Sequence, residues 1–496
     1  MAKKKMMMIP DRLETCHDPL RITRLTFIPE KLGDLVSMAI KIGILVCLIG
    51  SIALAIHSTF AKPDRWFPLP EHLHIIQNDS IIEIDVETTN ISHIVFGIAG
   101  SSNTWHSRSN YGKLWWNSNT CRGYVWLDKR PRNLKADDEL IPYKISKGWA
   151  KFKHTHSASA VRIARIVYDS FRLGLPNVRW FVMGDDDTVF FPENLATVLG
   201  KYDHNQLYYI GGNSESVEQD VMHSFDMAFG GGGIAISYAL AARLANIMDS
   251  CLHRYFYFYG SDQRVWACIK ELGVSLTRES GFHQFDVQGN PYGILAAHPL
   301  APLVSLHHLD RLNSLFPNQT QMSSLRKLIG AYQLDPARIV QQSICYDHSR
   351  KWSISISWGY SIQIYSLLVS AADLQMPLQT FKTWRTWSDG PFTFNTRWIN
   401  PDVCEQPSIF FLDRVKKVGT GSVMTYKRSV DQEAKKCNRA DGELRRIKVS
   451  ALRLNSEYWK NVPRRHCCQF MNGGSIKDGN VHIRIRKCRP QETIST

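Results

Sequence analysis

Short apolar runs alternate with segments of helical periodicity between about residues 92 and 310. Four of the apolar runs predict buried strands, and these cover residues 93–100, 123–128, 178–184 and 207–212. Between the second and third runs, residues 158–173 carry apolar side chains at roughly helical spacing. Strands that alternate with helices in this way predict an α/β fold, with a mostly parallel sheet between helices.

From about residue 347 the spacing of the apolar side chains changes. They alternate with polar side chains at a period of two in residues 351–358, 360–365 and 481–486. This period is typical of strands with one buried face. We therefore predict a second, β-rich module over residues 347–496, and its composition is rich in lysine and arginine.

One segment near the N-terminus has the composition of a membrane span. Residues 35–56 include a single charge, Lys41, and are long enough to cross a bilayer. The uninterrupted apolar part, residues 42–56, also suits a signal-peptide core, but a long segment precedes it and no clear cleavage site follows. Basic residues before the span predict a cytosolic N-terminus, and hence a single-pass type II anchor.

Length and charge narrow the classes of protein and partner. The chain has 496 residues and a formal net charge of +15. That charge suits nucleic acid, an anionic membrane surface or an acidic substrate, but no nucleic-acid-binding signature is present, so we expect no nucleic-acid partner. We divide the chain into a cytosolic tail, a transmembrane anchor, a stem, an α/β catalytic domain and the β-rich module, with boundaries at residues 1–34, 35–57, 58–91, 92–346 and 347–496.

Cysteines and glycosylation sequons agree with a lumenal position for everything after the span. Nine of the 11 cysteines follow the span, and in an oxidising lumen most of them would pair. Because nine is odd, one cysteine is free or bonds another chain. Sequons begin at Asn78, Asn90 and Asn318.

Three consecutive carboxylates, Asp185, Asp186 and Asp187, follow the predicted strand at 178–184. Active sites of open α/β sheets lie at the carboxyl ends of the strands. Clustered carboxylate oxygens suit Mn²⁺ or Mg²⁺, and those ions suit a diphosphate. The alternative is a solvated acidic turn before a helix that begins at Pro192.

Two further segments can supply parts of a site. A run of glycines at 230–233 lets the backbone at Gly231 and Gly232 approach a ligand closely, although a flexible hinge would have the same composition. Cys251 and Cys268 flank an aromatic loop that carries Asp262, and we predict a disulfide between them. A carboxylate held in that loop would be a better base if it were partly desolvated, whereas an ordinary turn aspartate is the alternative.

The order of these features resembles a known family. The triple aspartate after a strand, the four glycines before a capped helix, the aspartate six residues before a cysteine and the run Val304-Ser305-Leu306-His307 are similar to fringe and core 1 galactosyltransferase-like β-1,3-glycosyltransferases. Residues 179–187, 260–262 and 281–286 most resemble the plant fringe-related branch that carries a domain of unknown function. The resemblance implies a GT-A fold, a UDP-sugar donor, Mn²⁺ (or Mg²⁺), a glycan or glycoprotein acceptor, and inversion at the anomeric carbon. The span, the basic segment before it and the sequons after it predict a Golgi-resident type II membrane protein.

The resemblance also implies a role for individual residues. Asp187 and His307 would bind the metal, Asp185 would lie on the ribose or sugar side of the donor with Asp186 between the two, and Asp262 would be the catalytic base. Nucleotide or phosphate contacts would come from Asp128, Arg108 and Arg165. The plant branch usually has a second aspartate after the base, and this chain has Gln263 there.

Two other functions stay open, one because of that departure and one because of the triple aspartate. If the base were at the position of Gln263, the chain would be a weak or inactive lumenal protein that binds glycans without transferring sugar. A metal-dependent phosphoester hydrolase would instead need further Asp and His clusters for two metals, and the sequence offers only His307-His308.

Overall fold

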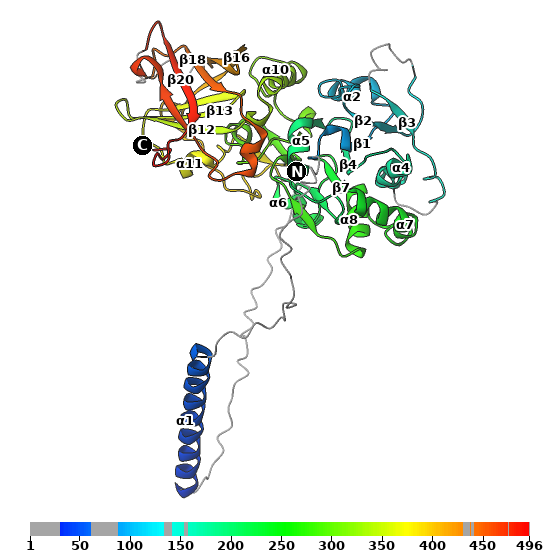
Figure 1. Ribbon diagram of the computed structural model, residues 1–496, viewed down its shortest axis with the longest axis vertical. Coiled ribbons are helices and arrows are strands. Elements are labelled where there is room, and N and C mark those ends of the chain that lie inside the picture. Colours follow the sequence, from blue (N-terminus) through cyan, green and yellow to red (C-terminus); the bar gives the residue numbers. More distant parts are fainter. Residues whose placement is uncertain are drawn as a thin grey trace, which may run out of the picture. The chain divides into compact units, whose positions relative to one another are not determined.

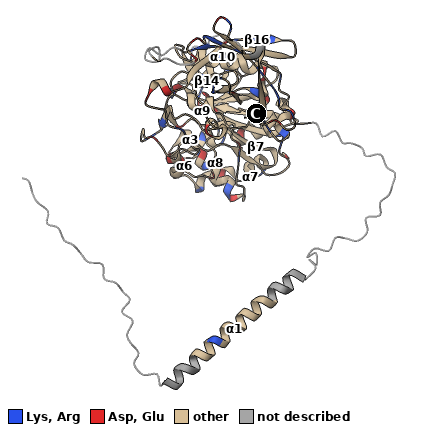
Figure 2. Ribbon diagram, turned by 90° about the vertical axis from the view of Figure 1, so that its left-hand side faces the viewer, with Lys and Arg blue, Asp and Glu red and all other residues tan. Residues whose placement is uncertain are grey.

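The computed structural model describes residues 30–60, 88–132, 141–152, 157–429, 437, 441–474 and 476–495. The chain divides into two compact units, Met1–Asp85 and Val86–Thr496. The first unit contains helix α1 (Glu30–Phe60), whose described middle carries one charge, Lys41 (Figure 2). No helix among the described residues is long and apolar enough for a membrane crossing, so the structure gives the anchor predicted at 35–57 no support. The tail before residue 30 and most of the stem, residues 61–87, lie outside the described part.

The second unit is built on a seven-stranded sheet with the order β3-β2-β1-β4-β7-β6-β8. Its strands are β1 (Ile94–Ala99), β2 (Arg122–Leu127), β3 (Tyr143–Ile145), β4 (Trp180–Asp185), β6 (Tyr209–Gly211), β7 (Ile234–Ser237) and β8 (Leu276–Arg278). The four strands β3, β2, β1 and β4 run parallel, whereas β7 runs antiparallel to both of its neighbours. The α/β prediction is confirmed, with a mixed sheet in which most neighbouring strands are parallel.

Helices cover both faces of this sheet (Figure 1). Along β1, Ile94, Phe96 and Ile98 join one core cluster with residues of α2 (Trp105–Gly112) and α5 (Pro192–Leu199). Val95 joins the opposite cluster, with α3 (Ala158–Ala164), α4 (Ile166–Phe171), α7 (Tyr238–Arg254) and α8 (Ser261–Glu271). Every residue of β1 is buried for this reason. The helix predicted at 158–173 is two helices, because it breaks at Arg165.

A small three-stranded sheet lies beside the end of β4 and positions the site. Its central strand, β11 (Ser305–Leu306), runs antiparallel to β5 (Val189–Phe190) and parallel to β9 (Phe282–His283). Three segments that are far apart in the sequence therefore meet directly after the triple aspartate.

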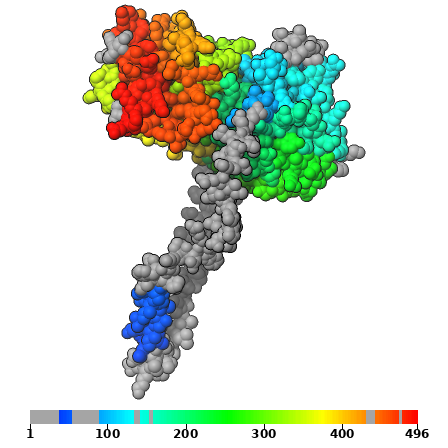
Figure 3. All heavy atoms as spheres, in the orientation of Figure 1, coloured from blue at the N-terminus to red at the C-terminus, as the bar shows by residue number. Residues whose placement is uncertain are grey.

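The C-terminal part forms an eight-stranded sheet, with the order β12-β13-β14-β16-β17-β18-β20-β19. Its strands are β12 (Gln342–Asp347), β13 (Trp352–Ser357), β14 (Ser361–Tyr365), β16 (Ser408–Val418), β17 (Gly421–Arg428), β18 (Arg446–Leu452), β19 (His466–Phe470) and β20 (Asn480–Lys487). In the space-filling view these yellow to red residues belong to one body with the cyan to green α/β part (Figure 3).

The prediction of one buried face is wrong for two of these strands. Every residue of β13 and β14 is buried, including the serines. Two serine hydroxyls of β13 find partners inside the protein: Ser353 donates to the Leu367 carbonyl at 2.9 Å and Ser357 to the Leu295 carbonyl at 2.7 Å. A buried hydroxyl that donates to a carbonyl costs little, so a polar side chain does not imply an exposed face.

Four disulfides link the described cysteines, and the predicted Cys251–Cys268 bond is among them. The other three are Cys345–Cys468, Cys404–Cys437 and Cys467–Cys488. The ninth cysteine of the second unit, Cys121, is free and buried. Of the two alternatives for the odd cysteine, the structure shows the free thiol.

Candidate functional site

Three side chains that can bind a metal ion meet where β4 ends. Asp185 is the last residue of β4, Asp187 lies in the turn that follows, and His307 comes directly after β11. Their ligand atoms all lie within 4.8 Å of one another. His307 Nε2 is 3.2 Å from Asp187 Oδ1 and 3.6 Å from Asp185 Oδ2. Pairing of β11 with β5 produces this cluster, because it aligns the segment before His307 with the segment after Asp187.

The donor atoms of this cluster fit a divalent cation. Both carboxylate oxygens of Asp187 are buried and accept no hydrogen bond of good geometry within the described chain. Buried polar atoms in that state are unfavourable, and a bound ion would satisfy them. Two carboxylates and an imidazole are ligands that Mn²⁺ accepts.

Negative charge is concentrated at this point. Burial, together with the carboxylates of Asp187, Asp262 and Asp186, raises the pKa of Asp185 well above its usual range. Burial acts in the same direction on Asp187, but His307, Arg108 and His308 outweigh it and lower the pKa of Asp187 to about 2. The ionised carboxylate of Asp187 therefore lies beside the carboxyl group of Asp185, which is hard to ionise. A bound cation would reduce the repulsion between the two carboxylates.

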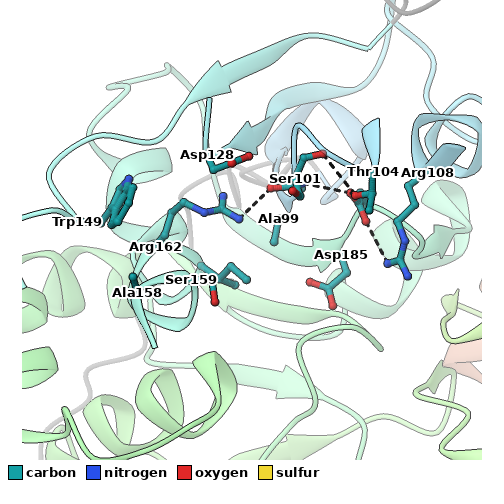
Figure 4. Close-up of a pocket in the computed structure, with 13 residues that line it drawn as sticks. Ala99, Ser101, Thr104, Arg108, Asp128, Trp149, Ala158, Ser159, Arg162 and Asp185 are labelled. Atoms are coloured by element: carbon teal, nitrogen blue, oxygen red, sulfur yellow. Dashed lines mark hydrogen bonds and ion pairs between the residues drawn. The ribbon is translucent and has the colours of Figure 1, made fainter. Parts of the chain in front are cut away.

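A cavity of about 410 Å³ opens beside the cluster (Figure 4). Its volume lies in the range of small-molecule sites. Trp149 lies at one end and Arg108 at the other, with Asp185 between them (Figure 4). The lining residues come from the ends of β1, β2 and β4, from α2 and α3, and from the segment between β3 and α3. They are Ala99, Gly100, Ser101, Thr104, Arg108, Asp128, Trp149, Ala158, Ser159, Arg162, Ile163, Asp185 and Asp186.

Arg108 joins the cavity to the cluster. Its Nη1 lies 2.9 Å from Asp187 Oδ2 and 3.3 Å from Asp186 Oδ1, and its Nη2 lies 3.2 Å from Asp310 Oδ2. Asp186 also accepts from the backbone N–H of Ser101 at 3.4 Å. Asp186 therefore holds Arg108 and the turn after β1, and it also lines the cavity.

Asp128 lines the cavity. The backbone N–H of Ser102 donates to its Oδ1 at 2.8 Å. Burial alone raises the pKa of Asp128, but this bond and the charge of Arg162 outweigh burial and lower it. Asp128 therefore presents an ionised carboxylate to the cavity.

The buried arginine of the cavity is Arg162, whereas the sequence pointed to Arg165. Arg162 donates from Nη1 to the Trp126 carbonyl at 2.8 Å and from Nη2 to the Gly100 carbonyl at 2.9 Å. Arg165 is not among the lining residues and pairs with Asp169 and Asp249 instead. The break between α3 and α4 falls at Arg165, and no sequence signal marked it.

Gly231 and Gly232 lie behind the metal cluster and do not line the cavity. A Cβ at Gly231 would lie 2.0 Å from Cε1 of His307, so only glycine lets the imidazole take this position. Thr188 Oγ1 donates to the Gly231 carbonyl at 2.7 Å, and the Gly232 N–H donates to Gln284 Oε1 at 2.7 Å. Gly231 therefore makes room for the His307 imidazole, whereas Gly232 contacts Gln284.

Asp262 lies in the first turn of α8, close to the cluster. Its Oδ2 accepts from the Gly230 N–H at 3.0 Å and its Oδ1 from the Ser261 hydroxyl at 2.9 Å. Together with Asp185 and Gly230 it lines a second, smaller cavity. The side chain of Gln263 turns back and accepts from the Gly260 N–H at 3.3 Å, as a cap of its own helix. Of the two neighbouring positions, Asp262 is the one that faces the cluster.

Comparison with protein families gives two matches. Residues 89–291 match a family described as Fringe-like, and residues 219–468 match a family described as Protein of unknown function, DUF604. The first match contains the whole triple aspartate and glycine run, and the second extends through most of the C-terminal sheet. No curated protein matches the chain.

Two solved structures are similar over part of the chain. One is a glycosyltransferase involved in the glycosylation of the major capsid of PBCV-1, with 10% identity, a TM-score of 0.24, and coverage of 48% of this chain and 98% of that one. The other is mouse xyloside xylosyltransferase 1 in its apo form, with 8% identity, a TM-score of 0.23, and coverage of 36% and 81%. TM-scores this low carry no argument about the fold.

Proposed function

Because this chain belongs to the DUF604 family and is a fringe-related, glycosyltransferase-like protein, we propose that it moves a sugar from a UDP-sugar to a hydroxyl group of a glycan or glycoprotein. The proposal includes a GT-A fold, dependence on Mn²⁺, inversion and a β-1,3 linkage. One observation carries it: Asp185, Asp187 and His307 converge beside a cavity of about 410 Å³ that is lined by Asp128 and two arginines.

The donor would lie along this cavity. Trp149 and Asp128 offer an aromatic face and an ionised carboxylate for the nucleoside, and Arg108 offers a guanidinium near the diphosphate. Asp187 and His307 would hold the metal ion, with Asp185 at its edge. A divalent cation, when bound, supplies Lewis-acid charge that stabilises the departing diphosphate.

Asp262 would act on the acceptor. Inversion requires the acceptor oxygen to attack the anomeric carbon on the face opposite the diphosphate. The new bond joins that oxygen to the anomeric carbon, the bond to the diphosphate oxygen breaks with its electron pair, and the acceptor proton passes to an oxygen of Asp262. The Gly230 N–H and the Ser261 hydroxyl orient the Asp262 carboxylate for this role.

We also propose a cellular compartment for the second unit. The four disulfides of the second unit are typical of chains that fold in an oxidising lumen. Glycan and glycoprotein acceptors meet UDP-sugars in the lumen of the Golgi apparatus, so we place the second unit there.

Calorimetry with UDP, followed by a donor screen, tests the proposal. We expect UDP to bind the full chain in the presence of Mn²⁺ and to bind much more weakly after chelation. Release of UDP from one of a panel of UDP-hexoses, UDP-pentoses and UDP-N-acetylhexosamines would identify the donor. A chain that binds no UDP with Mn²⁺ would not be the proposed enzyme.

A second candidate, a glycan-binding protein without transfer, is favoured by one face of the C-terminal sheet. Lys427 lies opposite Arg446 on neighbouring strands, and Lys448 lies opposite His482. Burial, Lys448 and Arg484 together lower the pKa of His482. Like charges in opposite positions destabilise a sheet, and an acidic glycan would offset this. Retention on polygalacturonate that is lost in Lys448→Glu, without UDP release from any donor, would favour this candidate.

A further inference from the structure

A segment of the C-terminal part returns to the metal cluster. Strand β15 (Phe381–Thr383) pairs antiparallel with β10 (Val287–Gly289), which follows β9 in the α/β part. Gln288 Nε2 donates to the Trp384 carbonyl at 3.2 Å. The loop that follows β15, residues 384–390, therefore has a fixed position relative to the cluster.

Trp384 is stacked against the neighbour of a metal ligand. Its indole lies parallel to the His308 ring, with 4.9 Å between centroids and 4° between planes. The His308 ring lies 3.9 Å from the His307 ring, and its Nδ1 is 2.9 Å from Asp286 Oδ1. These ring contacts, from His307 through His308 to Trp384, hold the first residue of the loop beside the cluster.

Hydrogen bonds hold the rest of the loop. Glu218 of α6 (Val217–Met222) accepts from the Arg385 N–H at 2.6 Å and from the Thr386 hydroxyl at 3.1 Å. Thr383 N–H donates to the Ser388 carbonyl at 2.9 Å, which closes the loop. The loop is thus fixed at both ends and at its middle.

Trp387, at the tip, is the one large hydrophobic side chain that this loop exposes. It is 55% exposed, and its φ of 53° lies in the left-handed region that a bulky residue rarely adopts. An exposed indole and a strained backbone both cost free energy. Both therefore indicate that this side chain serves binding and not the stability of the fold.

His223 connects the loop to the base. His223 follows α6, the helix whose Glu218 holds the loop, and its ring lies 5.7 Å from that of Phe229, which precedes the Gly230 that donates to Asp262. Nδ1 of His223 is buried and has no hydrogen-bond partner among the described residues. Contacts therefore link the proposed base, Asp262, through Gly230, Phe229 and His223 to α6 and the loop, and we treat the side chains of Asp262, His223, Arg385 and Trp387 as one surface. None of these residues lines the donor cavity.

We propose that this surface is the acceptor subsite and that it binds a carbohydrate, with a sugar ring stacked on the indole of Trp387. The proposal rests on the proposed function, because it takes Asp262 as the base. The chemistry favours a sugar, since its C–H face packs on an indole while its hydroxyls bond to polar groups such as His223 and Arg385. The C-terminal part would then complete the active site.

Saturation-transfer NMR tests the subsite with defined probes. Methyl β-glycosides of galactose, glucose, xylose and N-acetylglucosamine would be titrated onto the full chain with UDP and Mn²⁺. We expect at least one probe to bind, and its Kd to rise about tenfold or more in Trp387→Ala. Trp398→Ala is the matched control, because Trp398 is 69% exposed and lies outside the loop.

A second variant separates binding from folding. Trp387→Gly removes the indole and also relieves the left-handed backbone, so it should bind the probe as weakly as Trp387→Ala while its midpoint of thermal unfolding stays or rises. Equal probe affinity in wild type and both variants, or no binding of any probe to a chain that binds UDP, would overturn the subsite. UDP calorimetry on the same samples tests the proposed function separately. If the wild type bound no UDP, the proposed function would be wrong, whether or not a probe bound.

Discussion

Asp187 has two buried oxygens that lack hydrogen bonds of good geometry, and it lies beside an imidazole and a guanidinium. We predict that Asp187→Ala abolishes Mn²⁺-dependent UDP binding, because the diphosphate would lose the ion that matches its charge. Calorimetry of UDP with and without Mn²⁺ measures this. Asp310→Ala is the control, since Asp310 shares the partner Arg108 but lies outside the cluster. Unchanged binding in Asp187→Ala would remove this residue from the metal site.

Asp262→Asn should separate binding from transfer. The amide keeps the shape of the side chain and loses the charge that accepts a proton, so turnover should fall by roughly 10²–10⁴ while UDP affinity stays nearly intact. A UDP-release assay and calorimetry give the two readings. Full transfer by Asp262→Asn would refute the base assignment. A sharp gain in Gln263→Asp would show that the neighbouring position limits this chain, although Gln263 caps α8 here.

Gly231 supports His307 by the absence of a side chain. Gly231→Ala would place a Cβ 2.0 Å from the imidazole, so the ring must move and Mn²⁺ affinity should drop at least tenfold. Gly330→Ala is the control, because no atom lies within 4 Å of that position in α10 (Gln321–Leu334), and alanine there should add about 0.5–1 kcal/mol of stability. Wild-type Mn²⁺ affinity in Gly231→Ala would show that the imidazole has room to shift.

At the scale of elements, the Cys251–Cys268 disulfide ties α7 to the helix that carries Asp262. The bond closes a loop with a sequence separation of 17, and loop entropy assigns it about 3 kcal/mol of stability. Chemical denaturation of the double variant Cys251→Ser/Cys268→Ser should show that loss, whereas Cys404→Ser/Cys437→Ser should leave the Asp262 region unaffected. Free thiols at both positions in unreduced peptide maps would contradict the bond.

At the scale of the whole molecule, we predict that the second unit lies in a lumen and carries a glycan at Asn318. The sequon residue Asn318 is exposed, so a transferase can reach it. A glycosidase-sensitive mass shift should be present in wild type and lost in Asn318→Gln.

In sealed microsomes the second unit should resist protease until detergent is added. Digestion without detergent would place this unit on the cytosolic side.

Local sequence pattern determined the strands and the carboxylates at their ends. An apolar run followed by Asp185-Asp186-Asp187 is a property of adjacent residues, and in a sheet with parallel strands it places acids at the carboxyl edge. Spacing alone could not select His307, which is 120 residues away; the family resemblance selected it, and the pairing of β11 with β5 explains it.

The tertiary structure decided which side chains face the site. Arg162 of α3 lines the cavity and Arg165, at the break after α3, does not. The Leu295 and Leu367 carbonyls accept from buried serines that the period of two had assigned to solvent. Pairing of β15 with β10 brought Trp384 to His308 from the far part of the chain. Periodicity reports only how one segment divides between two faces, whereas contacts between distant segments depend on strand register and packing, which no single segment encodes.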